Sequence, residues 1–353
     1  MLSSSWSLDN QHTVIQNFVS KLKRHPKRIV FSEGEDERVI QAAEKLVELE
    51  AIAPILLGNR EVIEQKADEL GVSLKFVGIK DPKTSGEKEL FCDYYSKSER
   101  FRGVRVANVE ETVEKPQNFA AIMVQYGFAD AMLGGNQVLP STVFRAASNM
   151  IKPVDDDYSP FGVSLVINKN EGQDAPVTVM SDTAIIPNPT LKELTFIAKQ
   201  TAIFTKHILG HPPLVAMLSH GTRGSSYGED VSRVRAATEL IQDHIGTQGL
   251  AFDVIGEVQA DVALNAASYD MKLESKVPFR RADALVFPDL DAANISFHML
   301  ENFANISTLG HFIKGFTRPV AQVSRSVDVD ALISTAVILG SEAIKYRLLY
   351  DKN

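Results

Sequence analysis

Short apolar runs of strand length alternate along this chain with segments whose apolar residues recur at helical spacing. Near the N-terminus, residues 11–24 have the pattern of an amphipathic helix, and residues 27–31 form a strand-like run. A second strand is expected at 53–58, a helix at 61–70 and a third strand at 74–77. Strands that alternate with helices build a parallel sheet through right-handed crossovers. The sequence therefore predicts an α/β fold.

The composition is that of a globular protein large enough for two domains or one large one. The chain has 353 residues, of which 44% are apolar and 23% charged, and its net charge of −8 argues against a nucleic-acid partner. No stretch approaches the roughly 18–20 apolar residues of a membrane span, and the N-terminus lacks a signal-peptide pattern. The single cysteine, Cys92, excludes an internal disulfide framework and fits a reducing compartment. We therefore expect a cytoplasmic protein.

The composition changes to turn residues at 152–157, which is a plausible crossing between two domains. Further strand-like runs follow at residues 161–167, 177–180, 214–218, 252–257 and 284–290. The run at 214–218 is apolar throughout, as in a buried parallel strand. Polar residues follow several of these runs, so ligand-binding side chains are expected at one edge of the sheet.

A loop rich in glycine and hydroxyl groups, residues 219–226, follows the buried strand at 214–218. It reads S-H-G-T-R-G-S-S, and its N–H groups and hydroxyls could converge on a phosphate. The spacing is not that of a Walker loop. The alternative is an ordinary turn before the next helix.

The turn at residues 32–38 is acidic and precedes a helix. Acidic residues in a helix's first turn complement its dipole, so helix capping is the favoured interpretation. No G-x-G-x-x-G is present, and carboxylates repel a pyrophosphate, so a dinucleotide fingerprint is absent here.

Two regions carry arginines that could contact a polyphosphate. Arg100, Arg102 and Arg105 lie close together after a tyrosine pair, although such a cluster is more often a solvated helix face. A strand at 129–135 ends in a glycine pair, and a helix carrying Arg145 follows it. Sequence alone leaves both interpretations of the arginine cluster open.

Residues 319–330 have the pattern of a strand-to-helix turn near the end of the chain. They read P-V-A-Q-V-S-R-S-V-D-V-D, and an apolar run of helical length begins at Ala331. A turn of this kind presents side chains and free helix N–H groups at one edge of a sheet. The hydroxyl, guanidinium and two carboxylates here therefore mark a candidate site.

These polar strand ends, taken in order, resemble the phosphate acetyl/butyryltransferase family. The similarity runs from about residue 25 to 350, and several separated motifs in one order are far more specific than any one of them. The matching segments are residues 27–38 (K-R-I-V-F-S-E-G-E-D-E-R), 187–190 (P-N-P-T), 215–226 (V-A-M-L-S-H-G-T-R-G-S-S), 256–261 (G-E-V-Q-A-D), 287–294 (F-P-D-L-D-A-A-N) and 324–325 (S-R).

The resemblance implies two three-layer α/β domains with mostly parallel sheets, an architecture like that of isocitrate and isopropylmalate dehydrogenases. The second domain, residues 157–310, would be inserted into the first, residues 1–156 and 311–353. The implied reaction is acetyl-CoA plus phosphate to acetyl phosphate plus CoA, reversible and without a metal. CoA would be a substrate rather than a resident cofactor, and the resemblance implies a homodimer.

The resemblance also implies roles for individual residues. Asp330 would be the catalytic base, Ser324 would hydrogen-bond the thiol or intermediate, and Arg325 would stabilise the anion. The CoA-binding positions implied are Arg145 and, less directly, Arg100 or Arg102. The phosphate or acyl phosphate would be held by Ser219, Thr222, Arg223, Gly224, Ser225 and Asn294.

Proton transfer from the CoA thiol to the Asp330 carboxylate is uphill in free energy unless the site changes the pKa of one of these two groups. Free thiol and aspartate pKa values differ by roughly 4.5 units, which is about 6 kcal/mol. Asp330 would need a raised pKa, or Arg325 or a helix N-terminus would need to stabilise the thiolate. No enzyme nucleophile is required, so we expect Cys92 to be a small buried or half-buried residue.

The chain departs from the family pattern S-R-G-C-S-x-x-D, because the loop from Ser324 to Asp330 is one residue shorter. Three interpretations are open. Asp330 is still the base, Asp328 is the base in its place, or both aspartates only cap the last helix. The sequence D-A-A-N at 291–294 is closer to the related domain fused to malic enzymes, which resembles an effector-binding module.

Three functions therefore compete. The first is a phosphate acyltransferase acting on acetyl or on propanoyl and butyryl groups, and the second is a catalytically silent acetyl-CoA-binding module. The third is a dehydrogenase of the same architecture. It is disfavoured because the sequence shows no carboxylate trio with metal-ligand placement and no adenine-ribose motif.

Overall fold

The structure is a computed structural model that describes residues 6–102, 108–273 and 277–350, with the side chains of 6–98, 108–273 and 277–344. The chain forms two compact units, and the second interrupts the first along the sequence. The first unit comprises Met1–Val154 with Phe316–Asn353, and the second comprises Asp155–Gly315. The sequence had placed the limits of the inserted part at 157 and 310.

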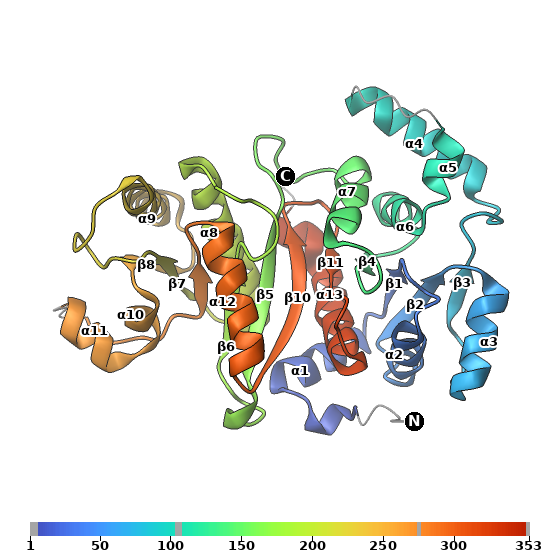
Figure 1. Cartoon of the computed structure of the whole chain (residues 1–353), viewed down its shortest axis with the longest axis horizontal. Helices are drawn as coiled ribbons and strands as arrows, with labels where there is room; N and C mark the ends of the chain where they lie inside the picture. Colours follow the sequence, from blue (N-terminus) through green and yellow to red (C-terminus); the bar gives the residue numbers. More distant parts are fainter. Residues whose placement is uncertain (1–5, 103–107, 274–276, 351–353) are drawn as a thin grey trace. The chain divides into compact units, whose positions relative to one another are not determined.

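Five parallel strands form the sheet of the first unit, in the order β3-β2-β1-β4-β11 (Figure 1). They are β1 (Lys27–Phe31), β2 (Ile52–Leu57), β3 (Gly78–Lys80), β4 (Ala131–Gly134) and β11 (Val320–Gln322). The helices of this unit are α1 (Thr13–Leu22), α2 (Glu37–Glu48), α3 (Arg60–Leu70), α4 (Lys88–Arg102), α5 (Val109–Val113), α6 (Pro116–Gln125), α7 (Pro140–Met150) and α13 (Val329–Tyr350), with the 3₁₀ turn η1 (Leu8–Asn10).

The order in which strands are added to the sheet changes direction at β1, with β2 and β3 on one side of it and β4 and β11 on the other. The chain runs outward from β1 to β3 through α2 and α3, and then returns to β4 through α4, α5 and α6. Because such crossovers are right-handed, the two sets of helices cover opposite faces of the sheet. The carboxyl ends of β1 and β4 are therefore a topological switch point, where open α/β sheets bind ligands.

Two local predictions differ from the structure. Residues 74–77 are not a strand: Val77 N–H donates to Leu74 C=O (3.0 Å) in a turn, Phe76 is 75% exposed with a φ of 66°, and β3 begins only at Gly78. The left-handed backbone at Phe76 interrupts the extended chain, and β2 pairs with the residues that follow, Gly78–Lys80. The helix that carries Arg145 begins at Pro140, which takes the first helical position and places Ser141 in the first turn, where the sequence had suggested that Ser141 precedes the helix.

Six strands form the sheet of the second unit, in the order β10-β5-β6-β9-β7-β8. They are β5 (Phe161–Asn168), β6 (Val177–Ser181), β7 (Leu214–Leu218), β8 (Asp253–Val258), β9 (Ala284–Val286) and β10 (Ile306–Lys314). β5 is antiparallel to β10 and β6, and the other pairs are parallel. The helices are α8 (Leu191–Leu209), α9 (Glu229–Gln248), α10 (Ala260–Leu264), α11 (Ala266–Leu273) and α12 (Leu290–Phe303), with η2 (Lys169–Glu171).

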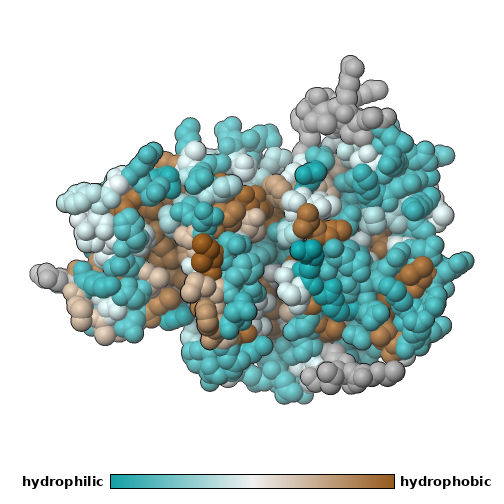
Figure 2. Space-filling model, in the orientation of Figure 1, coloured by the Kyte–Doolittle hydropathy of each residue, from teal (hydrophilic) through white to brown (hydrophobic). Residues whose placement is uncertain are grey.

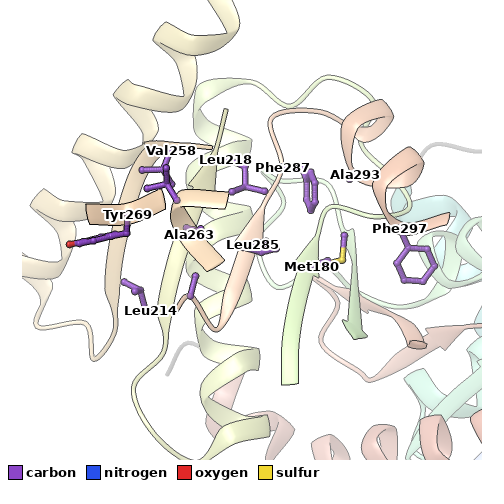
Figure 3. Packing of buried hydrophobic residues seen from close by; sticks show 13 residues of the cluster. Met180, Leu214, Leu218, Val258, Ala263, Tyr269, Leu285, Phe287, Ala293 and Phe297 are labelled. Carbon is purple, nitrogen blue, oxygen red and sulfur yellow. The ribbon is translucent and has the colours of Figure 1, made fainter. Parts of the chain in front are cut away.

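The mostly parallel α/β fold expected from the sequence is thus confirmed. In the second unit, side chains from β6, β7 and β9 pack with those of α10, α11 and α12 in one buried cluster (Figure 3). Helix α8 begins with a capping box, in which Thr190 and Glu193 satisfy each other's backbone N–H groups. None of the helices within the described ranges is long and apolar enough to cross a membrane.

An apolar stripe remains on the surface of α12. Ile295, Met299 and Phe303 recur at every fourth residue and are 59%, 53% and 83% exposed. Figure 2 shows apolar side chains on the face of the second unit to which this helix belongs. Exposed apolar patches of this kind commonly mark interaction surfaces.

Candidate active site

The acidic turn after β1 folds as a helix cap, as the sequence predicted. Asp36 is the N-cap of α2, and its carboxylate accepts the N–H of Arg38 at 2.9 Å. Burial raises the pKa of Asp36, but hydrogen bonds from Arg38 outweigh burial and hold the pKa below its ordinary value. The carboxylate is therefore ionised at neutral pH.

Glu33 in the same turn connects β1 to the loop after β4. Its two oxygens accept the Gly135 N–H (2.8 Å) and the Gln117 side-chain amide (2.8 Å), and the residue is 7% exposed. Burial raises the pKa of Glu33 in spite of these donors. Gly135 has a φ of +105°, and a Cβ there would lie 2.7 Å from Val323 C=O, so only glycine fits this crossing.

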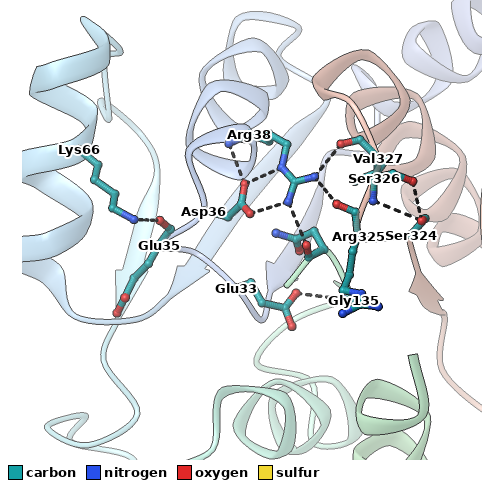
Figure 4. Close-up of polar contacts among 11 residues, drawn as sticks. Glu33, Glu35, Asp36, Arg38, Lys66, Gly135, Ser324, Arg325, Ser326 and Val327 are labelled. Atoms are coloured by element: carbon teal, nitrogen blue, oxygen red, sulfur yellow. Dashed lines mark hydrogen bonds and ion pairs between the residues drawn. The ribbon is translucent and has the colours of Figure 1, made fainter. Parts of the chain in front are cut away.

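Residues 324–330, the candidate catalytic loop, connect β11 to α13 at the same edge of the sheet (Figure 4). Ser324 starts a tight turn in which its C=O accepts the Val327 N–H at 3.1 Å. The Ser324 and Ser326 hydroxyls are 2.8 Å apart. Ser324, Arg325 and Ser326 are all exposed. The predicted strand-to-helix turn is confirmed.

The two aspartates of the candidate catalytic loop have different positions. The Asp328 carboxylate accepts the Ala331 N–H at 2.7 Å, so Asp328 performs the capping of α13. Asp330 lies half-buried in the first turn of the helix. The structure thus shows Asp328 as a cap of the last helix, and the role of Asp330 as the base stays a prediction.

Of the arginines expected to bind CoA, Arg145 is exposed on α7, the helix that follows the loop after β4. Arg100 and Arg102 belong to the last turn of α4, but their side chains lie outside the described residues, as does Arg105 entirely.

The Gly-Ser loop at 219–226 joins β7 to α9, as expected, but most of its N–H groups are already bonded. Thr222 N–H donates to the Ser225 hydroxyl (2.9 Å) and Arg223 N–H to Glu257 C=O (3.0 Å). Gly224 N–H donates to the Glu257 carboxylate at 2.8 Å. These N–H groups are thus bonded within the protein, and the role of the loop in binding a phosphate stays a prediction.

Side chains of this loop remain available at the surface. Arg223 is exposed and has a left-handed φ of 36°, which is uncommon for a residue with a Cβ. Ser219 is half-buried and Ser225 is exposed, while Thr222 is buried. Asn294 is half-buried on α12, two residues after Ala292, whose N–H binds the N-cap Asp289. All of these residues belong to the second unit, whereas Ser324, Arg325 and Asp330 belong to the first.

Glu257 holds the Gly-Ser loop in place. The residue is 2% exposed and receives two hydrogen bonds from the Arg235 guanidinium, at 3.0 and 2.8 Å. Burial raises the pKa of Glu257, but Arg235 and the Gly224 N–H outweigh burial and keep the pKa below its ordinary value. The loop thus surrounds an internal carboxylate.

A second polar cluster in this unit surrounds His311. Its Nδ1 lies 2.8 Å from the Ser164 hydroxyl and 2.9 Å from the Thr183 hydroxyl, which are themselves 2.8 Å apart. The register of β10 against β5 shifts between Leu309 and Phe312, so His311 lies in a β-bulge. Burial lowers the pKa of His311 to about 4, with a smaller contribution from His298.

The lowered pKa of His311 predicts a loss of stability in mild acid. A neutral imidazole is favoured in the fold, so its contribution is complete above the ordinary pKa of 6.5 and is lost as the pH falls towards 4. Between pH 7 and about pH 4.5 the wild type should lose about 2 kcal/mol more than His311→Asn, allowing for partial exposure of the ring. Urea unfolding at both pH values measures the difference, and equal losses would contradict this role.

Cys92 is half-buried on α4, as expected for a residue that is not a nucleophile. Burial raises the pKa of its thiol, and the charge of Glu110 adds to the effect. A thiol with a raised pKa is a poor nucleophile at neutral pH.

The roles of Arg38, Asn136 and Arg235 were not predicted from the sequence. Arg38 lies in the motif at 27–38, and an arginine two residues after an N-cap aspartate can reach its carboxylate. Asn136 acts through its backbone carbonyl, for which sequence has no signal. Arg235 meets Glu257 only because α9 packs on β8.

Comparisons with known proteins agree with the motifs. The family described as "Phosphate acetyl/butaryl transferase" matches residues 13–339. The phosphate acetyltransferase of Thermoanaerobacterium thermosaccharolyticum is 33% identical over 332 residues, which cover 92% of this chain and 99% of that protein. The crystal structure of a phosphotransacetylase from Streptococcus pyogenes superposes with a TM-score of 0.84 at 27% identity, covering 94% of this chain and 98% of the other.

A malic enzyme is also similar. The NADP-dependent malic enzyme of Rhizobium meliloti is 31% identical over 339 residues, which are 94% of this chain but only 42% of the malic enzyme. The phosphate acetyltransferase, by contrast, is matched along nearly its whole length. The family matches most of the length of this chain, and the fold is shared. The chain therefore belongs to the phosphate acetyl/butyryl transferase family of enzymes.

Proposed function

We propose that the protein is a phosphate acetyltransferase, which interconverts acetyl-CoA plus phosphate and acetyl phosphate plus CoA by direct attack in a ternary complex. The observation that carries the proposal is the loop at 324–330, which retains Ser324, Arg325 and Asp330 at the strand-to-helix turn, with Asp328 capping the helix. Family membership and the relatives named phosphate acetyltransferase support the acetyl group as the one transferred.

In the direction of acetyl-CoA synthesis, the Asp330 carboxylate accepts the thiol proton. The sulfur then attacks the acetyl carbonyl, the new C–S bond forms, and the C–O bond to phosphate breaks so that phosphate leaves with the electron pair. Arg325 stabilises the developing anion with its guanidinium fork, and Ser324 hydrogen-bonds the thiol or the intermediate. Holding both substrates together supplies much of the rate by proximity.

The phosphate-binding residues proposed are the side chains of Thr222, Arg223, Ser225 and Asn294, with Ser219 at the start of the loop. Gly224 belongs to the loop through a φ of 84°, which glycine adopts readily, and its N–H donates to the Glu257 carboxylate. Arg223 is the natural anchor, since its guanidinium is exposed and can donate two parallel hydrogen bonds to phosphate.

CoA is proposed to bind through Arg145, with Arg100 or Arg102 as further contacts. Arg145→Ala is expected to raise the apparent KM for CoA about tenfold with little change in kcat, since one charge-assisted hydrogen bond contributes roughly 1.5–3 kcal/mol. Steady-state kinetics with varied CoA measure the effect. An unchanged KM would remove Arg145 from the CoA site.

A homodimer in the cytoplasm is part of the proposal. The stripe formed by Ile295, Met299 and Phe303 supports a covered face on α12, because large apolar side chains at these exposures are costly in water. The single cysteine fits a reducing compartment.

A catalytically silent acetyl-CoA-binding module is the second candidate. It is favoured by the shortened loop at 324–330 and by the similarity of the malic enzyme. A propanoyl or butyryl preference is a variant of the first candidate, since one methylene in a pocket changes binding by only about 1–3 kcal/mol.

One assay separates these candidates. Acetyl-CoA is supplied with and without phosphate, and the release of free thiol is followed. Release that requires phosphate supports the transferase, and faster release from butyryl-CoA would change the proposed acyl group. Tight binding of acetyl-CoA without any release would replace the transferase by the binding module.

A further inference from the structure

The guanidinium of Arg38 uses all five of its N–H donors within the first unit (Figure 4). Two donors bind the Asp36 carboxylate side-on, at 3.0 and 2.8 Å. The others bind three backbone carbonyls, those of Arg325 (2.8 Å), Val327 (2.9 Å) and Asn136 (2.9 Å). A planar fork with five donors is the one side chain that can satisfy such a set of acceptors.

These acceptors come from three separate loops at one edge of the sheet. Asp36 follows β1, Asn136 follows β4, and Arg325 and Val327 follow β11. β4 pairs with both β1 and β11, so the three loops meet at the switch point of the doubly wound sheet. Arg38 therefore links the loop at 324–330 to the rigid part of the first unit.

The loop at 324–330 depends on such a link because little of it is buried. Ser324, Arg325 and Ser326 are exposed, so no apolar packing fixes this part of the backbone. Its carbonyls on either side of Ser326 are instead held by Arg38. Asp36 is 7% exposed in its side chain and fixes the guanidinium in turn, so the link is preorganised.

We propose that Arg38 is a positioning residue of the acyltransferase: it holds the backbone of the 324–330 loop so that Ser324, Arg325 and Asp330 keep their working arrangement. The inference rests on the proposed function for its catalytic consequence. Arg38 itself touches no substrate in this proposal, because its donors are all engaged by the protein. Removal of the Arg38 side chain should therefore lower kcat and leave the affinity for the substrates nearly unchanged.

The chain offers a matched control in Arg28. This residue also binds a carboxylate with two donors, Nε (3.2 Å) and one terminal nitrogen (3.1 Å) to Asp130, and a backbone carbonyl, that of Gly127 (2.9 Å). It belongs to the same unit but lies at the opposite, amino end of β1. Its loss removes similar bonds without touching the loop at 324–330.

The test compares Arg38→Ala, Arg38→Lys and Arg28→Ala in the full-length protein. Arg38→Ala is expected to lower kcat at least about 100-fold while the KM values for CoA and acetyl phosphate change by less than about threefold, because a shift of about 1 Å in catalytic groups is enough for such a loss. Arg38→Lys should recover little, since an ammonium cannot bind all five acceptors. Arg28→Ala should keep kcat within about twofold.

Two further measurements report on the link directly. Guanidinium ion at non-denaturing millimolar concentration should restore part of the kcat of Arg38→Ala and none in Arg28→Ala. Hydrogen exchange of the peptide that spans residues 324–330 should become faster in Arg38→Ala only. If Arg38→Ala does not fold, Asp36→Asn/Arg38→Ala replaces it, because asparagine keeps the helix cap and leaves no unpaired buried charge.

The outcomes distinguish this inference from the proposed function. Three results would each overturn the positioning role. They are equal losses of kcat in Arg28→Ala and Arg38→Ala, a rise in KM without a fall in kcat in Arg38→Ala, and unchanged hydrogen exchange of the loop at 324–330. If the wild type shows no phosphate-dependent thiol release, the proposed function fails and the catalytic consequence of Arg38 falls with it. The hydrogen exchange would still decide whether Arg38 holds the loop.

Discussion

Asp330→Asn is expected to lower kcat for acetyl transfer about 1000-fold, because an amide cannot accept the thiol proton. General-base catalysis contributes roughly 10²–10⁴-fold, so the expected loss corresponds to about 4 kcal/mol of transition-state stabilisation. The substitution keeps the shape of the side chain in the first turn of α13, so KM values should change little. Steady-state thiol release and the binding of acetyl-CoA to the variant measure both quantities.

Asp328→Asn is the matched control for Asp330→Asn. Asp328 caps α13 through the Ala331 N–H, and asparagine caps a helix as well as aspartate does. This variant should therefore keep both its stability and its kcat. A large loss of kcat in Asp328→Asn together with an active Asp330→Asn would assign the base to Asp328, and full activity in both variants would remove the carboxylate from the mechanism.

Glu257→Ala should reduce the stability of the protein by about 3 kcal/mol, because several charge-assisted hydrogen bonds to a buried carboxylate are lost together. The Gly224 N–H and the Arg235 guanidinium both lose their acceptor. The Gly-Ser loop would no longer be fixed, and the apparent KM for phosphate should rise several-fold if this loop binds it. Urea unfolding and phosphate kinetics test the two effects separately.

The control for Glu257→Ala is Glu64→Ala. Glu64 also pairs with an arginine, Arg60, but the two side chains are 51% and 58% exposed, and such pairs contribute about 0–1 kcal/mol. A loss in Glu257→Ala no larger than in Glu64→Ala would contradict the role of the buried carboxylate.

The effect of Glu257 should also depend on pH. Because its pKa is below the ordinary value, its contribution to stability is present above that ordinary pKa and is lost as the pH falls through the lowered one. The stability difference between the wild type and Glu257→Ala should therefore shrink in acid. A difference that stays constant below the ordinary pKa would show that packing, and not charge, accounts for the loss.

Much of the fold could be predicted because it depends on local patterns. The apolar face of α2 and the run at 214–218 are read directly from residue spacing, and both are buried as that spacing requires. The strand expected at 74–77 was wrong because a pattern of four residues does not specify whether a sheet partner is available. Strand pairing depends on residues far away in the sequence.

The candidate site was only partly predictable. The turn at 324–330 and the helix after it follow from the strand-to-helix pattern, and Asp36 as a cap follows from an acidic residue before an apolar helix. The occupied N–H groups of the Gly-Ser loop were not predictable, because their acceptor, Glu257, comes from another strand. A glycine-rich loop in a sequence does not show which anion it already holds.

The sequence by itself determined the alternation of strands and helices, the order of the motifs and therefore the family. These properties depend on the spacing of residues that are neighbours along the chain. Only the tertiary structure decided which aspartate caps the last helix, what Glu257 binds and what Arg38 holds together. Hydrogen bonds such as that from Arg38 to Val327, 289 positions apart, form because the sheet brings distant loops to one edge, and no local pattern records that meeting.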